Sequence, residues 1–142
     1  MKGLKNVKVY IKNVGVVTTN IGIENGKIAY IGDNAENIEP LFETDGVVLP
    51  GFIDEHIHGA GGADAMDGTV DALQTISEFV AREGTTGFLA TTMTQSPENI
   101  TSALKAVKKI REKGEYKGAE ILGVHLEGPF ISPKHVGAQP LE

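Results

Sequence analysis

Apolar and polar residues alternate along the first part of the chain with the two-residue period of β-strands. Residues 7–11 follow this pattern, and two further alternating runs within residues 21–31 flank the pair Asn25-Gly26. Both central positions of a tight hairpin turn need positive φ, which Asn and Gly adopt most readily, so the pair predicts a β-hairpin. A polar, irregular stretch then leads to Pro50-Gly51, which marks a boundary. The pattern predicts a small antiparallel β unit over residues 1–50.

Beyond this boundary, strands are predicted to alternate with helices. The elements expected in chain order are a strand over 52–58, a helix from Thr69 to Gly84, a strand over 87–92, a helix from Ser96 to Gly114 and a strand over 121–126. Ser96 suits the N-cap of its helix, and glycine suits the position after the last turn. Such alternation predicts a parallel sheet with right-handed crossovers, and leaves a barrel and a doubly wound sheet equally open. We therefore expect an α/β second part over residues 51–142.

Composition and charge exclude several classes of protein. The 142 residues are 40% hydrophobic and 23% charged, which is typical of a folded chain. The net charge of −6 argues against a nucleic-acid partner, because the only basic cluster, residues 105–113, lies near a predicted helix end, where cations are favourable. No apolar run approaches the roughly 20 residues of a membrane span, and no signal peptide is evident, so we expect a cytoplasmic protein without a membrane partner. The lack of cysteine excludes a thiol nucleophile and cysteine-ligated metals.

Two histidines stand at the carboxyl end of the first strand after Pro50. Side chains at positions i and i+2 share one face of a strand, so His56 and His58 can reach the same metal ion, with Asp54 one step before them. Imidazole nitrogen is a good ligand for zinc, iron or nickel. The alternative is a pair of surface histidines without a ligand. Their position favours the metal site, because active sites of βα folds collect at the carboxyl ends of the strands.

A carboxylate follows the third strand of this series at the corresponding end. His125 and Glu127 share one face, and a carboxylate there can ligate a metal ion or bridge two. The alternatives are a buried carboxylate paired with His125 and an acidic residue that caps a helix. Because the two histidines point to the same end, Glu127 completes the His₂Glu set that supplies three protein ligands in hydrolytic zinc sites.

Two neighbouring segments carry weaker signals. Residues 132–139 follow the strand that leads to Glu127, and they form either a covering loop over the site or a plain connection. The threonine-rich run over 84–94 is interpreted as structural, because threonine is favoured in strands. The glycines of residues 59–62 do not match a nucleotide-binding motif, so nucleotide binding is not expected.

These motifs together resemble a known family. Residues 49–59 resemble the first-strand signature of the amidohydrolase superfamily, and residues 21–32 resemble the hairpin of the small β-sandwich that precedes its barrel. Within that superfamily, three segments are similar to the N-acetylglucosamine-6-phosphate deacetylase family, namely residues 59–62, 125–130 and 137–140. The fold implied is the N-terminal part of a TIM-type (β/α)₈ metal-dependent hydrolase barrel, comprising its first three strands, preceded by a small β-sandwich portion.

The resemblance also implies an activity and roles for individual residues. It implies deacetylation of N-acetylglucosamine 6-phosphate to glucosamine 6-phosphate and acetate, with water activated by one or two divalent metal ions such as zinc or iron. The roles implied are metal ligation by His56, His58 and Glu127, contact with the sugar by Ala138 and Gln139, and support of the ligands by Asp54 and His125. A homodimer is implied for the full-length parent. Glu55, on the opposite face from His56, has no role in this interpretation.

A complete (β/α)₈ barrel needs about 250 residues, so 142 residues are expected to carry only part of it. The family's remaining metal ligands, its general-base aspartate and its phosphate-binding residues lie on later strands. We therefore assign no catalytic residue in this chain and expect a truncated, inactive N-terminal piece of a deacetylase. Two alternatives stay open. One is another amidohydrolase, such as a dihydroorotase or a dipeptidase, and the other is a non-catalytic metal-binding or interaction module that pairs through an open sheet edge.

Overall fold

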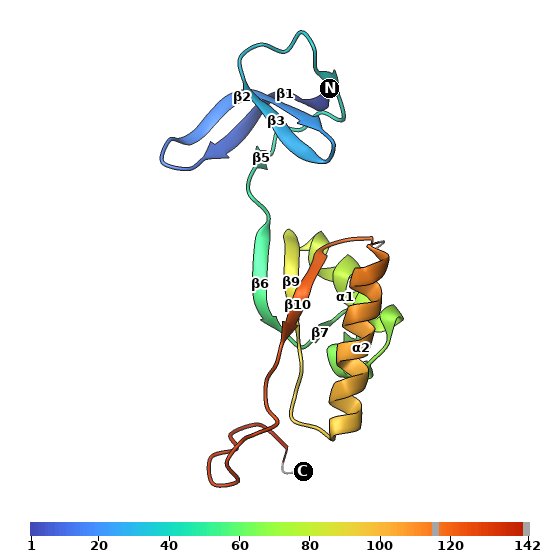
Figure 1. Ribbon diagram of the computed structural model, residues 1–142. Helices are drawn as coiled ribbons and strands as arrows, with labels where there is room; N and C mark the ends of the chain where they lie inside the picture. The colour runs from blue at the N-terminus through green and yellow to red at the C-terminus, as the bar shows by residue number, and fades with distance from the viewer. Residues whose placement is uncertain (115–116, 141–142) are drawn as a thin grey trace. The chain divides into compact units, whose positions relative to one another are not determined.

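The computed structural model describes residues 1–114 and 117–140, which belong to two compact units, Met1–Pro50 and Gly51–Glu142 (Figure 1). Each unit has its own sheet and its own cluster of buried apolar side chains. Within the described ranges, no helix is both long and apolar enough to cross a membrane.

The first unit is a five-stranded sheet built around β1 (Lys2–Ile11). The other strands are β2 (Gly15–Glu24), β3 (Lys27–Gly32), β4 (Glu39–Pro40) and β5 (Val47–Val48). Strands β1, β2 and β3 pair antiparallel, and the two short strands run parallel to β1. The predicted hairpin turn is confirmed, since Asn25 and Gly26 have φ of 52° and 72°.

Strand β2 begins earlier than the alternation predicts, and Asn20 explains why. This polar side chain is buried, so the strand lacks the apolar marker that a core-facing position normally carries. Its Oδ1 accepts a hydrogen bond from the Asn6 main-chain N–H at 2.9 Å, and its Nδ2 donates to the carbonyls of Gly32 at 2.9 Å and Asp33 at 3.0 Å. A buried amide satisfied in this way is compatible with the core, but sequence periodicity does not reveal it.

The second unit is a three-stranded parallel sheet, as the alternation predicts. Its strands are β6 (Phe52–Ile57), β9 (Thr85–Thr91) and β10 (Glu120–His125), and they lie in chain order across the sheet. The crossover helices are α1 (Val70–Arg82) and α2 (Pro97–Lys113), which lie on the same side of the sheet and contact each other (Figure 1). Between β6 and α1, a short hairpin of β7 (Gly59–Ala60) and β8 (Ala63–Asp64) is followed by the 3₁₀ helix η1 (Ala65–Asp67).

The helix ends follow their capping residues. The Thr69 hydroxyl accepts from the Ala72 N–H at 3.1 Å, and the Ser96 hydroxyl accepts from the Asn99 N–H at 3.3 Å. Gly114 ends α2 in the left-handed conformation, with φ of 62°. These contacts satisfy N–H and C=O groups that have no partner inside the helix, which is why the two N-termini are predicted correctly from local sequence.

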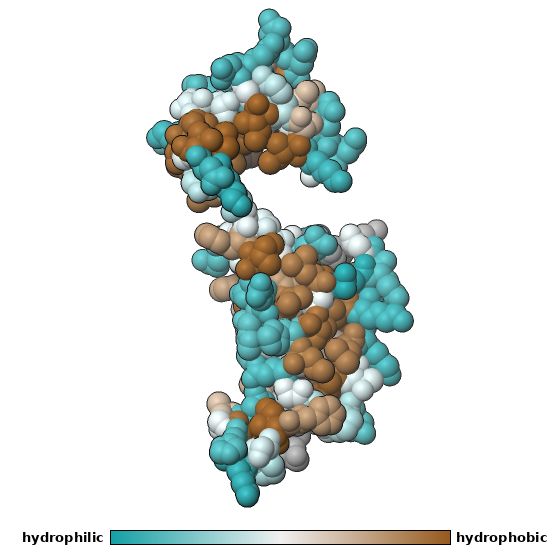
Figure 2. Space-filling view, turned by 60° about the vertical axis from the view of Figure 1, so that its left-hand side comes forward, coloured by the Kyte–Doolittle hydropathy of each residue, from teal (hydrophilic) through white to brown (hydrophobic). Residues whose placement is uncertain are grey.

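The helices bury one face of the sheet, and apolar side chains also occupy the other. Phe88 and Ile121 are fully buried in the cluster between sheet and helices. On the opposite face, the side chains of Ile53 and Leu122 lie over Gly87, and Ile53 is 58% exposed. Figure 2 shows hydrophobic atoms gathered on this unit. One face of the sheet is therefore packed against the helices, and the other carries apolar side chains that remain accessible to solvent in this chain.

Replacement of Phe88 by alanine should destabilise the second unit strongly, because Phe88 is fully buried in its core. We expect the Phe88→Ala variant to lose about 3–5 kcal/mol of unfolding free energy, measured by urea denaturation followed by far-UV circular dichroism. Phe130→Ala is the matched control, since Phe130 is 98% exposed and its loss should change stability by less than about 0.5 kcal/mol. Equal losses in the two variants would contradict this description of the core.

Candidate metal centre

The candidate metal centre lies at the carboxyl ends of the parallel strands. His56 belongs to β6, and His58 follows the end of that strand directly. Glu127 lies two residues after the end of β10. Because parallel strands end at the same edge of their sheet, the three side chains come together although they are distant in sequence.

Their ligand atoms are spaced as they would be around one ion. Oε2 of Glu127 lies 2.9 Å from Nε2 of His56 and 3.3 Å from Nε2 of His58, and the two Nε2 atoms are 3.4 Å apart. Atoms bound about 2.0–2.2 Å from a zinc-like ion in tetrahedral or octahedral arrangement lie roughly 3.0–3.5 Å from each other. The three side chains thus form a group that could hold a metal ion.

The hydrogen bonding around this group also fits a cation. Oε2 of Glu127 is buried and accepts no hydrogen bond from the described part of the chain, although both imidazoles approach it. An unsatisfied buried carboxylate oxygen is costly, and a cation would compensate it. The side chain of His56 is 50% exposed and that of Glu127 28%, so the group stays open to solvent on one side. Two imidazoles, one carboxylate and an open side are the donor set of a hydrolytic metal site.

The two predicted supporting residues act on the main chain near the histidines. Oδ1 of Asp54 accepts from the main-chain N–H of His56 at 3.0 Å, which fixes the backbone that carries the first ligand. Nδ1 of His125 lies 3.0 Å from the carbonyl oxygen of Glu55, and its ring centroid is 4.5 Å from that of His56. The contribution of Glu55 is therefore its carbonyl group, which links β6 to β10 through His125. Support of the ligands by Asp54 and His125 remains a prediction.

The two residues predicted to contact the sugar differ in their surroundings. Ala138 is exposed. The side chain of Gln139 reaches into the metal centre, where its Nε2 donates to Oε1 of Glu127 and its Oε1 accepts from the main-chain N–H of Thr94 at 3.0 Å. Sugar contact by these two residues remains a prediction. His135, in the same loop, is exposed.

Sequence analysis missed the part that Thr92 and Thr94 play at this edge. Both are buried, and both belong to the segment that follows β9. The Thr92 hydroxyl accepts from the Glu127 N–H at 3.1 Å, and the Thr92 N–H donates to the His125 carbonyl at 3.0 Å. The sequence signal that could have identified them is their position directly after β9. This strand lies between β6 and β10, which lead to the candidate ligands, so the residues that follow β9 lie at the same edge of the sheet.

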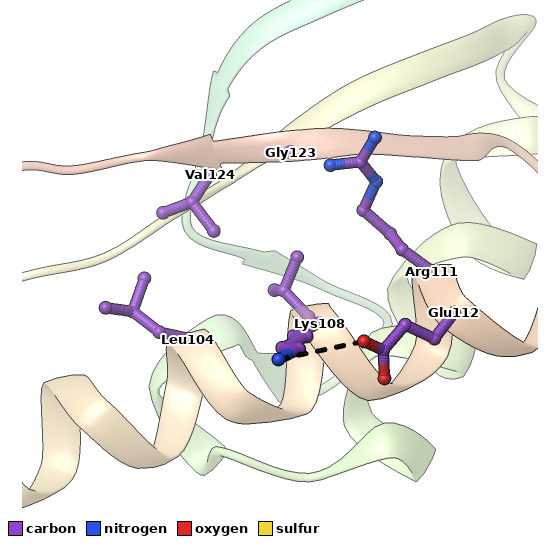
Figure 3. A pocket seen from close by; sticks show the side chains of 7 residues that line it. Leu104, Lys108, Arg111, Glu112, Gly123 and Val124 are labelled. Atoms are coloured by element: carbon purple, nitrogen blue, oxygen red, sulfur yellow. Dashed lines mark ion pairs between the residues drawn. The ribbon is translucent and has the colours of Figure 1, made fainter.

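A separate hollow of about 420 Å³ lies between α2 and β10 (Figure 3). Its lining consists of Leu104, Val107, Lys108, Arg111, Glu112, Gly123 and Val124. Lys108 and Glu112 form an exposed ion pair along the helix at 3.7 Å, and the side chain of Arg111 extends toward Gly123 (Figure 3). The hollow shares no lining residue with the metal centre. The only strand that lines it is β10, which ends the strand order of its sheet among the described residues.

Comparisons with known proteins identify deacetylases that are similar to this chain. The chain is 45% identical to the N-acetylglucosamine-6-phosphate deacetylase of Bacillus subtilis, over 93% of this chain and 37% of that protein. It is 40% identical to an N-acetylgalactosamine-6-phosphate deacetylase of Escherichia coli, over 74% of this chain and 29% of that protein. The crystal structure of N-acetylglucosamine-6-phosphate deacetylase from Thermotoga maritima matches with a TM-score of 0.76 and 37% identity, covering 97% of this chain and 35% of that one.

The chain thus spans 29–37% of the length of these relatives. The sequence pattern of the amidohydrolase family matches residues 47–141, which include all three candidate metal ligands and the whole parallel sheet. The chain belongs to the amidohydrolase family.

Proposed function

We propose that this chain supplies the metal-binding part of a deacetylase that acts on N-acetylglucosamine 6-phosphate, giving glucosamine 6-phosphate and acetate. The observation that carries the proposal is the group formed by His56, His58 and Glu127, found in a chain 45% identical to the Bacillus subtilis deacetylase. Because the chain covers about a third of such relatives, the activity is proposed for a protein of their length.

The arrangement of the second unit supports a place in a TIM-type barrel. Its strands follow chain order, and both helices lie on one side of the sheet, which is how a (β/α) barrel is built from its first strands. The free side of β10 and the hollow beside α2 would receive the next elements of such a barrel. In the same proposal, the sheet over residues 1–50 is the portion of a β-sandwich that precedes the barrel.

The residues of this chain would hold and orient the reacting groups. A divalent ion, either zinc, iron or a similar metal, supplies Lewis-acid activation of water and of the acetyl carbonyl when bound. His56, His58 and Glu127 provide its ligands here, and the exposed side of the group leaves room for substrate and water. Ala138 and Gln139 belong to the loop that would border the sugar. The proton-transfer and phosphate-binding residues belong to other segments in this proposal.

N-acetylgalactosamine 6-phosphate is a second candidate substrate. The observation that favours it is the 40% identity to the Escherichia coli relative, which bears that sugar in its name. The two sugars differ only in the configuration of one hydroxyl group, remote from the amide that is cleaved. The metal centre suits both substrates equally, so direct comparison of the two is required.

Loss of a metal ligand should weaken metal binding by this chain. We expect the His56→Ala and Glu127→Ala variants to bind Zn²⁺ at least about 100-fold more weakly than the unaltered chain, measured by competition with a chromophoric chelator. His135→Ala is the matched control, because His135 is an exposed histidine of the neighbouring loop. Unchanged affinity in both ligand variants would contradict the proposed centre.

The activity can be tested by extending this chain with the C-terminal part of the Bacillus subtilis relative. The folded chimera should release acetate from N-acetylglucosamine 6-phosphate, with a higher kcat/KM than for N-acetylgalactosamine 6-phosphate. Glu127→Gln should lower kcat/KM by on the order of 1,000-fold, because it removes the charged ligand. Higher kcat/KM with the galactosamine derivative would favour the second candidate. A chimera with a native circular dichroism spectrum that releases acetate from neither sugar would refute both.

A further inference from the structure

We propose that Gln139 is a positioning residue for the metal centre, which holds Glu127 in its ligating orientation and ties the segment after β10 to the segment after β9. This inference rests on the proposed metal-binding function. It goes beyond the sugar contact that family resemblance implies for Gln139, because it assigns the amide a role toward a ligand rather than toward the substrate.

The two oxygens of Glu127 have different surroundings, and Gln139 makes the difference. Oε1 accepts a hydrogen bond from Nε2 of Gln139, whereas Oε2 accepts none from the described residues and faces both imidazoles. The terminal torsion of a glutamate is broad and nearly two-fold, so a free carboxylate would sample many orientations. A donor on one oxygen selects the orientation in which the other oxygen meets the histidines.

The amide of Gln139 is itself held in a single orientation. Its Oε1 accepts from the Thr94 N–H at 3.0 Å while its Nε2 meets the carboxylate of Glu127. A flipped amide would place oxygen against carboxylate oxygen and NH₂ against a main-chain N–H, and both contacts would be repulsive. The neighbours of Gln139 therefore fix its amide with the oxygen toward Thr94 and the nitrogen toward Glu127, so the side chain connects these two residues in one orientation only.

A further hydrogen bond, from a main-chain N–H to a threonine hydroxyl, joins the same two segments. The Thr92 hydroxyl accepts from the N–H of Glu127, so the segment after β9 holds the backbone of this ligand directly. It holds the carboxylate only through Gln139. The close approach is possible because residue 128 is glycine, where a Cβ would collide with the Thr94 hydroxyl. Gln139 completes this set by fixing the one part of Glu127 that the backbone contacts leave free.

A neutral amide is suited to this position for an electrostatic reason. It donates a hydrogen bond to the carboxylate without neutralising the charge that attracts a cation. A lysine or arginine in its place would compete with the metal ion for Glu127. The role therefore needs a donor without charge that also accepts from Thr94, and glutamine meets both requirements.

The test compares Gln139→Met and Gln139→Glu in the 142-residue chain, with Zn²⁺ affinity measured by chelator competition. Gln139→Met removes both hydrogen bonds at similar volume, and we expect it to weaken Zn²⁺ binding by roughly 10- to 100-fold. Gln139→Glu keeps an acceptor for Thr94, but it puts a second negatively charged carboxylate where Oε1 of Glu127 now meets a donor. Because the two carboxylates repel, Glu127 should turn away from its ligating orientation, and a loss of at least about 10-fold is expected there as well. Lys134→Gln, an exposed change in the same loop, should bind as the unaltered chain does.

A second readout separates positioning from a general effect on folding. With saturating Co²⁺, the visible absorption bands report the ligand geometry, and we expect them to be altered in Gln139→Met and unaltered in Lys134→Gln. Equal or tighter Zn²⁺ binding in both Gln139 variants, or an unchanged Co²⁺ spectrum, would overturn the positioning role. The proposed metal centre is tested separately, since it is contradicted if both His56→Ala and Glu127→Ala bind Zn²⁺ as tightly as the unaltered chain.

Discussion

Parallel pairing of β6, β9 and β10 brings three strand ends to one edge, and the metal-binding group depends on this constraint. Neither histidine is near Glu127 in sequence, and no local turn could unite them. They meet because both crossover helices return the chain to the same end of the sheet, and those helices are held in place by buried apolar contacts such as those of Phe88. Packing on one face of the sheet thus determines the chemistry at its edge.

Buried polar atoms of the metal centre that lack hydrogen-bond partners oppose folding, and the carboxylate oxygen among them favours the binding of a cation. Oε2 of Glu127 and Nδ1 of His58 are buried without a hydrogen-bond partner in the described chain, and each such group opposes folding by about 1–3 kcal/mol. Hydrogen bonds with the Thr92 hydroxyl, which accepts, and the Gln139 amide, which donates, hold Glu127 in this unfavourable state. A bound cation would satisfy this carboxylate oxygen and so offset the cost of burying it.

Local chemistry made much of the fold predictable. Asn25-Gly26 has the torsions that its turn needs, and Ser96 caps its helix as expected, because each acts on its own backbone neighbourhood. The unpredicted features depend on contacts between segments. Asn20 is buried although it is polar, since carbonyls distant in sequence satisfy its amide. Thr94 looked like an ordinary strand residue because nothing in its local sequence points to Gln139. The grouping of the candidate ligands follows from where parallel strands end, whereas the contacts of Thr92 and Gln139 with Glu127 join segments that are not adjacent in sequence.

Gln139 can combine a positioning role with the sugar contact implied by family resemblance. A glutamine amide carries two N–H donors and two lone pairs on its oxygen. In the described structure, Glu127 takes one donor and the Thr94 N–H takes one lone pair, which leaves one of each for a sugar hydroxyl. A hydroxyl bound there would join substrate and metal ligand through a single side chain. Binding of the sugar would then restrict the motion of the Gln139 amide and, through it, the orientation of the Glu127 carboxylate. The same amide would contribute both to substrate binding and to the geometry of the metal centre.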